Sequence, residues 1–215
     1  MEMKMMHGPY RNEGTGKLLV TCVLLSLIAG LAGAWIFNNF KYDNDNLIAD
    51  YYETENAVIV SPHGLRKEIA KGSDNFLLVD LRSEEEYNRE HIVGAVNVPA
   101  YKDKDTSDYE AVERIVNSFR ALQESYPERD IVVYCYSRPC MTGRKVGKML
   151  AEDGIYVKHL GIGWNEWKYD WTSWNHEHEW NITSVDDYLS QGSEPGIFSG
   201  VNRTASCPIS GGFGC

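Results

Sequence analysis

The amino-acid sequence predicts an α/β domain with a doubly wound, mostly parallel sheet flanked by helices, preceded by one transmembrane helix. Two observations support this prediction. A charge-free apolar run, Leu18–Phe37, lies near the N-terminus. Beyond it, short apolar runs typical of strands alternate with segments of helical apolar spacing. Such alternation with short connections favours parallel strands, because right-handed crossovers place helices on both faces of a sheet.

The run Leu18–Phe37 is long enough, as a helix, to cross a hydrocarbon core of about 30 Å. A cleaved signal peptide is the alternative, although the run exceeds the usual apolar region of such peptides. Basic residues precede the run and mostly acidic residues follow it, so the positive-inside rule predicts a cytoplasmic N-terminal segment (residues 1–17) and an exocytoplasmic domain. The charges concerned are Lys4, Arg11 and Lys17 before the run and Lys41, Asp43, Asp45 and Asp50 after it.

The polar segment 38–55 is interpreted as a linker that holds the domain near the membrane. After it, strands and helices are expected in strict alternation. The predicted strands are Ala57–Val60, Phe76–Asp80, Val93–Val98, Ile131–Cys135 and Tyr156–Leu160, and the predicted helices are Gly64–Lys71, Ser83–Arg89, Ser107–Tyr126 and Gly143–Asp153.

The charge balance excludes one class of partner. The formal net charge is −10 at pH 7, and an acidic surface repels phosphate backbones, so we expect no nucleic-acid binding. The 215 residues provide for one domain of ordinary size, one membrane segment and a tail. A membrane-protein partner is compatible with this organisation.

Two segments resemble the rhodanese family, and the resemblance spans about residues 56–171. VDLRSEEEYNREHIVGAVNVP carries the family's Asp-x-Arg pair at Asp80 and Arg82 and its His-Ile-x-Gly-Ala-x-Asn-x-Pro signature from His91 to Pro99. IVVYCYSRPCMTGRKVGKMLAEDGI matches the strand, cysteine loop and helix that carry the nucleophile, here Cys135. The resemblance implies a sulfurtransferase domain (residues 56–175) that uses a small sulfur-containing anion and a thiol acceptor, without a cofactor.

The loop departs from the family pattern. Alignment on the following helix places Thr142 and Gly143 where a rhodanese carries Arg and Ser, and Cys140 is additional. Related phosphatases and arsenate reductases keep Cys-x5-Arg, whereas Met141 occupies that position here. The loop is a Cys-x4-Cys variant, which leaves the thiosulfate-specific reaction open.

Cys135 follows a buried strand and precedes a tight loop and a helix N-terminus, where backbone N–H groups converge. Such a site stabilises a thiolate, so we expect a lowered pKa at Cys135 and a persulfide held by the same N–H groups. The predicted substrate-binding residues are those of the loop and the first helical turn: Tyr136, Ser137, Arg138, Pro139, Met141, Thr142, Gly143 and Arg144.

Three side chains of the loop region have two interpretations each. Arg138 and Arg144 either replace the missing family arginine in binding an anion or point to solvent. Cys140 either resolves a persulfide or mixed disulfide on Cys135 or packs under the loop. Asp80 and Arg82 are expected to support the loop structurally, and His91 is expected in the core.

The C-terminal part offers weaker signals. The tryptophans from Trp164 to Trp174 share one face if the stretch is helical, with the first two in the core and the later ones, including Trp180, either in the core or at a membrane or partner surface. The sequence from His176 to Glu179 resembles a metal cluster but lacks a third ligand motif, so a solvated turn is expected and no metal is predicted. The tail, residues 176–215, is expected to be poorly ordered, with Cys207 and Cys215 either disulfide-bonded or metal-binding.

The sequence thus predicts a membrane-tethered rhodanese-like sulfurtransferase, with the persulfide on Cys135 and Cys140 as the resolving thiol. A dithiol oxidoreductase that uses the same two cysteines is one alternative. A non-catalytic rhodanese-like module that docks a membrane partner is the other.

Overall fold

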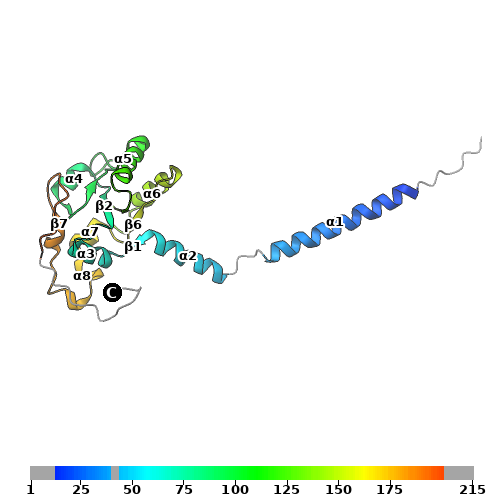
Figure 1. Ribbon diagram of the computed structural model, residues 1–215, viewed down its shortest axis with the longest axis horizontal. Helices are drawn as coiled ribbons and strands as arrows, with labels where there is room; N and C mark the ends of the chain where they lie inside the picture. The colour runs from blue at the N-terminus through cyan, green and yellow to red at the C-terminus, as the bar shows by residue number, and fades with distance from the viewer. Residues whose placement is uncertain (1–12, 40–43, 201–215) are drawn as a thin grey trace, which may run out of the picture. The chain divides into compact units, whose positions relative to one another are not determined.

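The computed structural model describes residues 13–39 and 44–200 (Figure 1). It divides into two units, one ending at Tyr51 and one beginning at Tyr52, and each is described by itself. Residues 1–12, 40–43 and 201–215, and with them Cys207 and Cys215, lie outside the described residues.

The described residues of the first unit, 13–39 and 44–51, are helical. Helix α1 (Glu13–Asn39) contains the predicted run Leu18–Phe37, and its span Gly14–Asn38 is long and apolar enough to cross a membrane. Helix α2 (Asn44–Val58) follows and continues into the second unit. The segment predicted as a linker is therefore helical from Asn44. Its sequence lacks Gly and Pro, so nothing in it interrupts a helix once one has formed.

The second unit is built on a five-stranded sheet in the order β1-β6-β5-β2-β4, in which all neighbouring strands are parallel. This confirms the predicted fold class. The strands are β1 (Ile59–Val60), β2 (Phe76–Asp80), β4 (Val96–Asn97), β5 (Asp130–Tyr134) and β6 (Lys158–Leu160). The central pair, β2 and β5, is apolar and buried on both faces, as is usual in parallel sheets.

Helices cover both faces of the sheet (Figure 1). Alternation along β5 directs Val132 and Tyr134 to one face and Ile131 and Val133 to the other. The first face is covered by α3 (Pro62–Lys71), α4 (Glu84–Arg89), α7 (Trp164–Tyr169) and α8 (Trp171–Trp174). The second face is covered by α5 (Val112–Ser125) and α6 (Thr142–Glu152).

Two predicted elements are shorter in the structure. The helix predicted from Ser107 begins at Val112, because Tyr101 and Ser107 form a β-bridge and the Asp108 N–H donates to the carbonyl of Ala100. These contacts hold the chain around Ser107 in an antiparallel pairing with residues 100–102, which is incompatible with a helical turn there. The predicted strand Val93–Val98 is reduced to β4, and His91–Ile92 forms a separate strand, β3.

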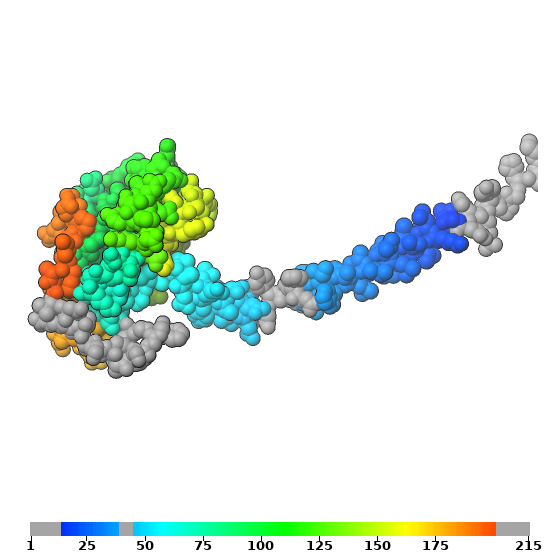
Figure 2. Space-filling model, in the orientation of Figure 1, coloured from blue at the N-terminus to red at the C-terminus, as the bar shows by residue number. Residues whose placement is uncertain are grey.

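Residues 176–200 pack on the domain, so the prediction of a poorly ordered tail is wrong for this part. Strand β7 (Leu189–Ser190) pairs antiparallel with β3, and the Gly94 N–H donates to the carbonyl of Pro195. Tyr188, at the end of the 3-10 helix η2 (Val185–Tyr188), is buried among the tryptophans of the first face. Figure 2 shows this segment, in orange, against the body of the domain. Aromatic contacts between Tyr188 and the tryptophans hold this segment on the domain, and the spacing of apolar residues along the sequence does not reveal such contacts.

The four tryptophans do not lie on a single helix. Asp170 separates α7 from α8, and the indole rings of Trp167 and Trp174 stack with their centroids 4.8 Å apart. Trp164, Trp167 and Trp171 are buried, which assigns Trp171 to the core rather than to an exposed surface. Trp180 remains exposed.

A buried ion pair joins the segment around η1 (Glu177–Glu179) to helix α3. Arg66 Nη2 lies 2.6 Å from Glu179 Oε1, and both side chains are almost completely buried. The solvated turn predicted for residues 176–179 is therefore wrong at Glu179. The signal was absent from the local sequence because the partner, Arg66, lies 113 residues earlier.

This pair yields a stability prediction. Glu179→Gln keeps the volume but leaves the Arg66 guanidinium buried without its counter-charge, so the free energy of unfolding should fall by about 3–5 kcal/mol. Chemical denaturation of the full chain in detergent, with a metal chelator present, measures this change. Glu177→Gln, at an exposed position two residues away, is the matched control and should change it by less than about 0.5 kcal/mol. Equal effects of the two substitutions would contradict the prediction.

Candidate active site at the cysteine loop

Cys135 comes directly after β5 and continues its alternation. Its side chain is 2% exposed and packs with Val133, Val146 and Leu150 on the face covered by α5 and α6. The sulfur therefore borders the apolar interior. This differs from the sequence prediction, which placed it among converging backbone N–H groups at the carboxyl end of the strand.

The loop folds Cys140 back over Cys135. A turn closed by the Cys140 N–H donating to the Ser137 carbonyl, at 3.0 Å, reverses the chain. The two Sγ atoms lie 3.4 Å apart, within hydrogen-bonding reach, and both thiols are free. Cys140 is half-buried and more exposed than Cys135, and its Sγ also lies 3.2 Å from the hydroxyl of Thr142.

The N-terminus of α7 holds the first half of the loop. The N–H groups of Trp164 and Asn165 donate to the carbonyls of Cys135 and Tyr136, each at 2.8 Å. Glu166 accepts from the Arg138 N–H at 3.1 and 3.2 Å through its two carboxylate oxygens. This loop amide is thus directed at a carboxylate and not at either sulfur.

Gly163 makes this close approach possible. A Cβ at position 163 would lie 2.2 Å from the Ser137 nitrogen, so any side chain there would displace the loop. Neither Glu166 nor Gly163 was identified from the sequence, because their role depends on a contact between segments about 28 residues apart.

The contact between the two thiols shifts their pKa values in opposite directions. The hydrogen bond with Cys140, together with burial, raises the pKa of Cys135. The same hydrogen bond lowers the pKa of Cys140 to about 4, against the effect of burial and with help from the Thr142 hydroxyl and the N–H groups of Thr142 and Tyr136. The lowered pKa that the sequence predicted for Cys135 therefore falls on Cys140.

Phenol groups surround the Thr142 hydroxyl. The hydroxyls of Tyr101 and Tyr109 lie 2.8 and 2.6 Å from Thr142 Oγ1. The ring of Tyr136 meets that of Tyr101 edge to face, and its hydroxyl donates to Glu86. Burial raises the pKa values of Tyr101 and Tyr136, so both remain neutral donors at physiological pH. Tyr101 and Tyr109 carried no signal in the sequence, whereas Glu86 belongs to the segment that resembles the family, without a role assigned to it.

The predicted substrate-binding residues are placed as follows. Arg138, Pro139 and Met141 are exposed on the loop, Ser137 is half-buried, and Thr142 and Gly143 are buried at the start of α6. The Arg144 guanidinium donates to the carbonyls of Arg138 and Cys140, each at 3.3 Å, so it braces the loop. Arg138 and Arg144 are both exposed, and of the two it is Arg144 that contacts the loop carbonyls.

Asp80 and Arg82 form a buried ion pair at the end of β2, with Arg82 Nη2 2.6 Å from Asp80 Oδ2. The guanidinium also lies over the Trp164 ring, 4.1 Å from its centroid, and so links β2 to the helix that holds the loop. His91 is fully buried, stacks on Tyr87 and bonds its carbonyl, which agrees with a core position.

The family assignment rests on the comparison of sequences. The Rhodanese-like domain profile matches residues 61–170, which include β2, the cysteine loop and α7. The chain belongs to the rhodanese-like domain family.

Proteins similar to this chain include a transcriptional regulator and two proteins of solved structure. The HTH-type transcriptional regulator Rv0324 of Mycobacterium tuberculosis is 30% identical over 145 residues, 66% of this chain and 58% of that protein, so the chain spans little more than half of that relative. BH2092 from Bacillus halodurans is similar with a TM-score of 0.44 and 19% identity, over 65% of this chain and 99% of that one. A rhodanese from E. coli, described with anions, is similar with a TM-score of 0.27 and 21% identity, over 40% and 85% of the two chains.

Beneath the loop of this rhodanese-like domain, His159 on β6 packs against the first turn of α6. A Cβ on Gly143 would lie 2.1 Å from His159 Nε2, so Gly143 admits the imidazole. Burial, followed by the charge of Arg144, lowers the pKa of His159, and its Nε2 has no hydrogen-bond partner among the described residues. The neutral imidazole of His159 therefore sets how closely the first turn of α6 packs on β6.

This packing predicts the effect of a single methyl group. Gly143→Ala should lower the free energy of unfolding by about 1–3 kcal/mol, because the buried imidazole cannot move aside freely. Gly147→Ala in the same helix is the control, since its Cβ would meet its nearest neighbour at an ordinary 3.7 Å. In a His159→Ala background the cost of Gly143→Ala should largely vanish. Denaturation curves that show the same cost in both backgrounds would refute the packing argument.

Proposed function

We propose that the chain is a membrane-anchored, rhodanese-like sulfurtransferase that works through the Cys135–Cys140 pair. The observation that carries the proposal is the 3.4 Å contact between the two sulfurs at the position of the family's cysteine loop. A neighbouring thiol gives a persulfide formed in this loop an intramolecular route of release.

The lowered pKa favours Cys140 as the attacking group, which exchanges the roles expected from the resemblance alone. The Cys140 thiolate attacks the sulfane sulfur of an anionic donor such as thiosulfate. A bond forms between Cys140 Sγ and that sulfur, and the donor's S–S bond breaks so that sulfite leaves with the electron pair. Thr142 and the half-exposed position of Cys140 support this step, since they stabilise the anion and leave it accessible.

The second step releases the sulfur from Cys140 by one of two routes. A small thiol acceptor can take the outer sulfur as its own persulfide and regenerate the Cys140 thiolate. Alternatively, Cys135 passes its proton to the outer sulfur of the persulfide and attacks Cys140 Sγ; the bond between the persulfide sulfurs breaks, HS⁻ leaves, and a Cys135–Cys140 disulfide forms. The two cysteines are then oxidised, the sulfane sulfur is reduced to sulfide, and an external thiol must reduce the disulfide before the next cycle.

Cations and the anchor support the proposal. Arg138 extends from the loop to solvent, where it can attract an anionic donor, and Arg144 braces the loop. Helix α1 is apolar enough to anchor the domain, and the charges on either side of the apolar run favour an exocytoplasmic domain. A signal-peptide role for α1 would instead release the domain from the membrane.

The proximity of the thiols also favours a second candidate function, a dithiol oxidoreductase. Forming a disulfide of about 2.05 Å requires the sulfurs to approach by roughly 1.4 Å, which a rotation of the half-exposed Cys140 side chain can supply. In that reaction a disulfide substrate is reduced to two thiols and the pair is oxidised, without transfer of sulfane sulfur.

Mass spectrometry of the unreduced cysteine-loop peptide tests the proposal. After incubation with thiosulfate, the Cys135→Ser protein should carry one added sulfur, about +32 Da, on Cys140. The wild-type protein should release sulfide and accumulate the Cys135–Cys140 disulfide. Cys22→Ser, in the apolar helix, is the matched control and should behave as wild type.

Each alternative has its own result. A label that persists in Cys140→Ser and is absent from Cys135→Ser would return the persulfide to Cys135. A disulfide formed with disulfide substrates but never with sulfane donors would favour the oxidoreductase. Unmodified thiols with every donor would leave a non-catalytic binding module.

A further inference from the structure

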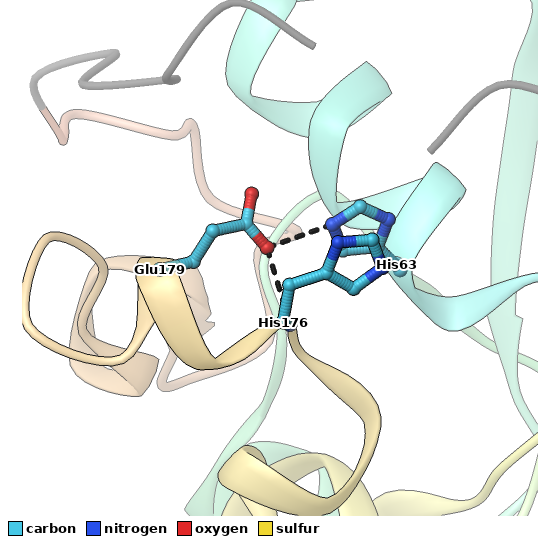
Figure 3. Close-up of side chains that lie close together, drawn as sticks. All are labelled: His63, His176 and Glu179. Carbon is cyan, nitrogen blue, oxygen red and sulfur yellow. Dashed lines mark hydrogen bonds and ion pairs between the residues drawn. The ribbon is translucent and has the colours of Figure 1, made fainter. Parts of the chain in front are cut away.

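Three potential metal ligands meet outside the cysteine loop, on segments far apart in the sequence. His63 is in the first turn of α3, whereas His176 and Glu179 flank and end the 3-10 helix η1. One ligand atom from each residue lies within 4.8 Å of those of the other two (Figure 3). Nothing in the rhodanese-like sulfur chemistry proposed above uses these residues.

The local backbone fixes His176 and Glu179 relative to each other. The Glu179 N–H donates to the His176 carbonyl at 2.8 Å, which closes the 3-10 turn. The His176 N–H in turn lies 3.4 Å from Glu179 Oε2. The spacing of three residues therefore places an imidazole and a carboxylate on the same side of the turn.

Helix α3 supplies the third group. His63 Nε2 lies 2.7 Å from Glu179 Oε2, and the His63 and His176 rings stack with centroids 4.3 Å apart and planes inclined by 10°. His63 and Glu179 are buried, whereas His176 is exposed. Figure 3 shows the carboxylate directed at the edge of the stacked rings. The cluster is thus anchored by its two buried members, His63 and Glu179, and is open to solvent at His176.

The donor atoms suit a cation. Imidazole nitrogens and carboxylate oxygens both bind divalent metal ions. Two of these atoms, Nε2 of the buried His63 and Oε2 of the buried Glu179, already face each other at 2.7 Å.

Arg66 determines how the carboxylate can bind. Its guanidinium occupies Oε1 at 2.6 Å and leaves Oε2 for a ligand, which favours monodentate coordination with a fixed outer partner. The positive charges of Arg66 and Lys67 near His63 weaken the attraction for a cation, so a tight structural site is not expected.

From this arrangement we infer that His63, His176 and Glu179 form a binding site for a divalent transition metal ion of the Zn²⁺ class, with water as the remaining ligand. Two imidazole nitrogens and one carboxylate oxygen are a donor set suited to Zn²⁺. Ligand lengths of about 2.0–2.2 Å place tetrahedral ligands roughly 3.3 Å apart. The separations in the cluster, from 2.7 Å to no more than 4.8 Å, bracket that value. Because the two rings are nearly parallel, the exposed His176 ring must turn out of its stack on His63 for its nitrogen to face the ion.

Binding exchanges one interaction for another. The proton that His63 Nε2 shares with Glu179 moves to Nδ1 of the same ring, and the ion takes its place between the nitrogen and Oε2. The ion then joins residues 176–179 to α3, in addition to the Arg66–Glu179 pair. Zinc binding should therefore raise the temperature at which the domain unfolds.

The test compares three forms of the full chain in detergent, each reduced and freed of metal with a chelator. His176→Phe removes the ligand nitrogen but keeps an aromatic ring on His63, and His178→Phe makes the same change at an exposed position nearby. Calorimetric titration with Zn²⁺ measures stoichiometry and affinity. Zinc held by cysteines is common to all three proteins and cancels in the comparison.

Wild type and His178→Phe should each bind one more Zn²⁺ than His176→Phe, or bind it at least about tenfold more tightly. Zn²⁺ should raise the unfolding temperatures of wild type and His178→Phe by more than it raises the unfolding temperature of His176→Phe. Equal titrations of the three proteins would overturn the inference. A wild-type Co²⁺ complex that shows solely thiolate coordination would overturn it without reliance on any variant, and neither result would bear on the sulfurtransferase proposal.

Discussion

Strand alternation places Cys135 on the face of the sheet that α5 and α6 cover, and the rest of the site depends on this constraint. A sulfur in the buried cluster that includes Val133, Val146 and Leu150 gains little from solvent and resists ionisation. The loop places Cys140 Sγ 3.4 Å from Cys135 Sγ. The hydrogen bond between the two sulfurs lowers the pKa of Cys140, so the negative charge lies on the more exposed of the two. The additional cysteine of this rhodanese-like loop therefore determines which of the two sulfurs ionises.

Much of this fold follows from local sequence. The apolar runs of β2 and β5 and the helical spacing of α6 are strong periodic signals, and they locate the cysteine loop between a buried strand and a helix N-terminus. The loop's surroundings do not follow in this way. Glu166, Tyr101 and His159 act through contacts between distant segments, and their residue types are common in unrelated settings. The direction of the two thiol pKa values likewise depends on a contact that spacing alone does not fix.

The same limit explains the C-terminal segment. His176 and Glu179 look like a solvated turn until α3 supplies Arg66 and His63, more than 110 residues earlier in the chain. Tyr188 looks like part of a polar tail until it meets Trp171 on the first face of the sheet. In both cases the stabilising partner is a buried group on a different element. Residues 176–200 are therefore an integral layer of the domain, and they create the one cluster of mixed His and Glu ligands found among the described residues.

The central claim is that the hydrogen bond between the loop thiols lowers the pKa of Cys140, which carries the charge. Ultraviolet absorbance of thiolates, followed during an acid titration of the reduced full chain, measures it when the Cys140→Ser protein is subtracted. The account predicts one thiolate with a pKa well below the ordinary thiol value, shifted upward in Cys135→Ala because the hydrogen bond with Cys135 is its main cause. Two thiols that titrate independently near the ordinary value of about 8.5 would contradict it.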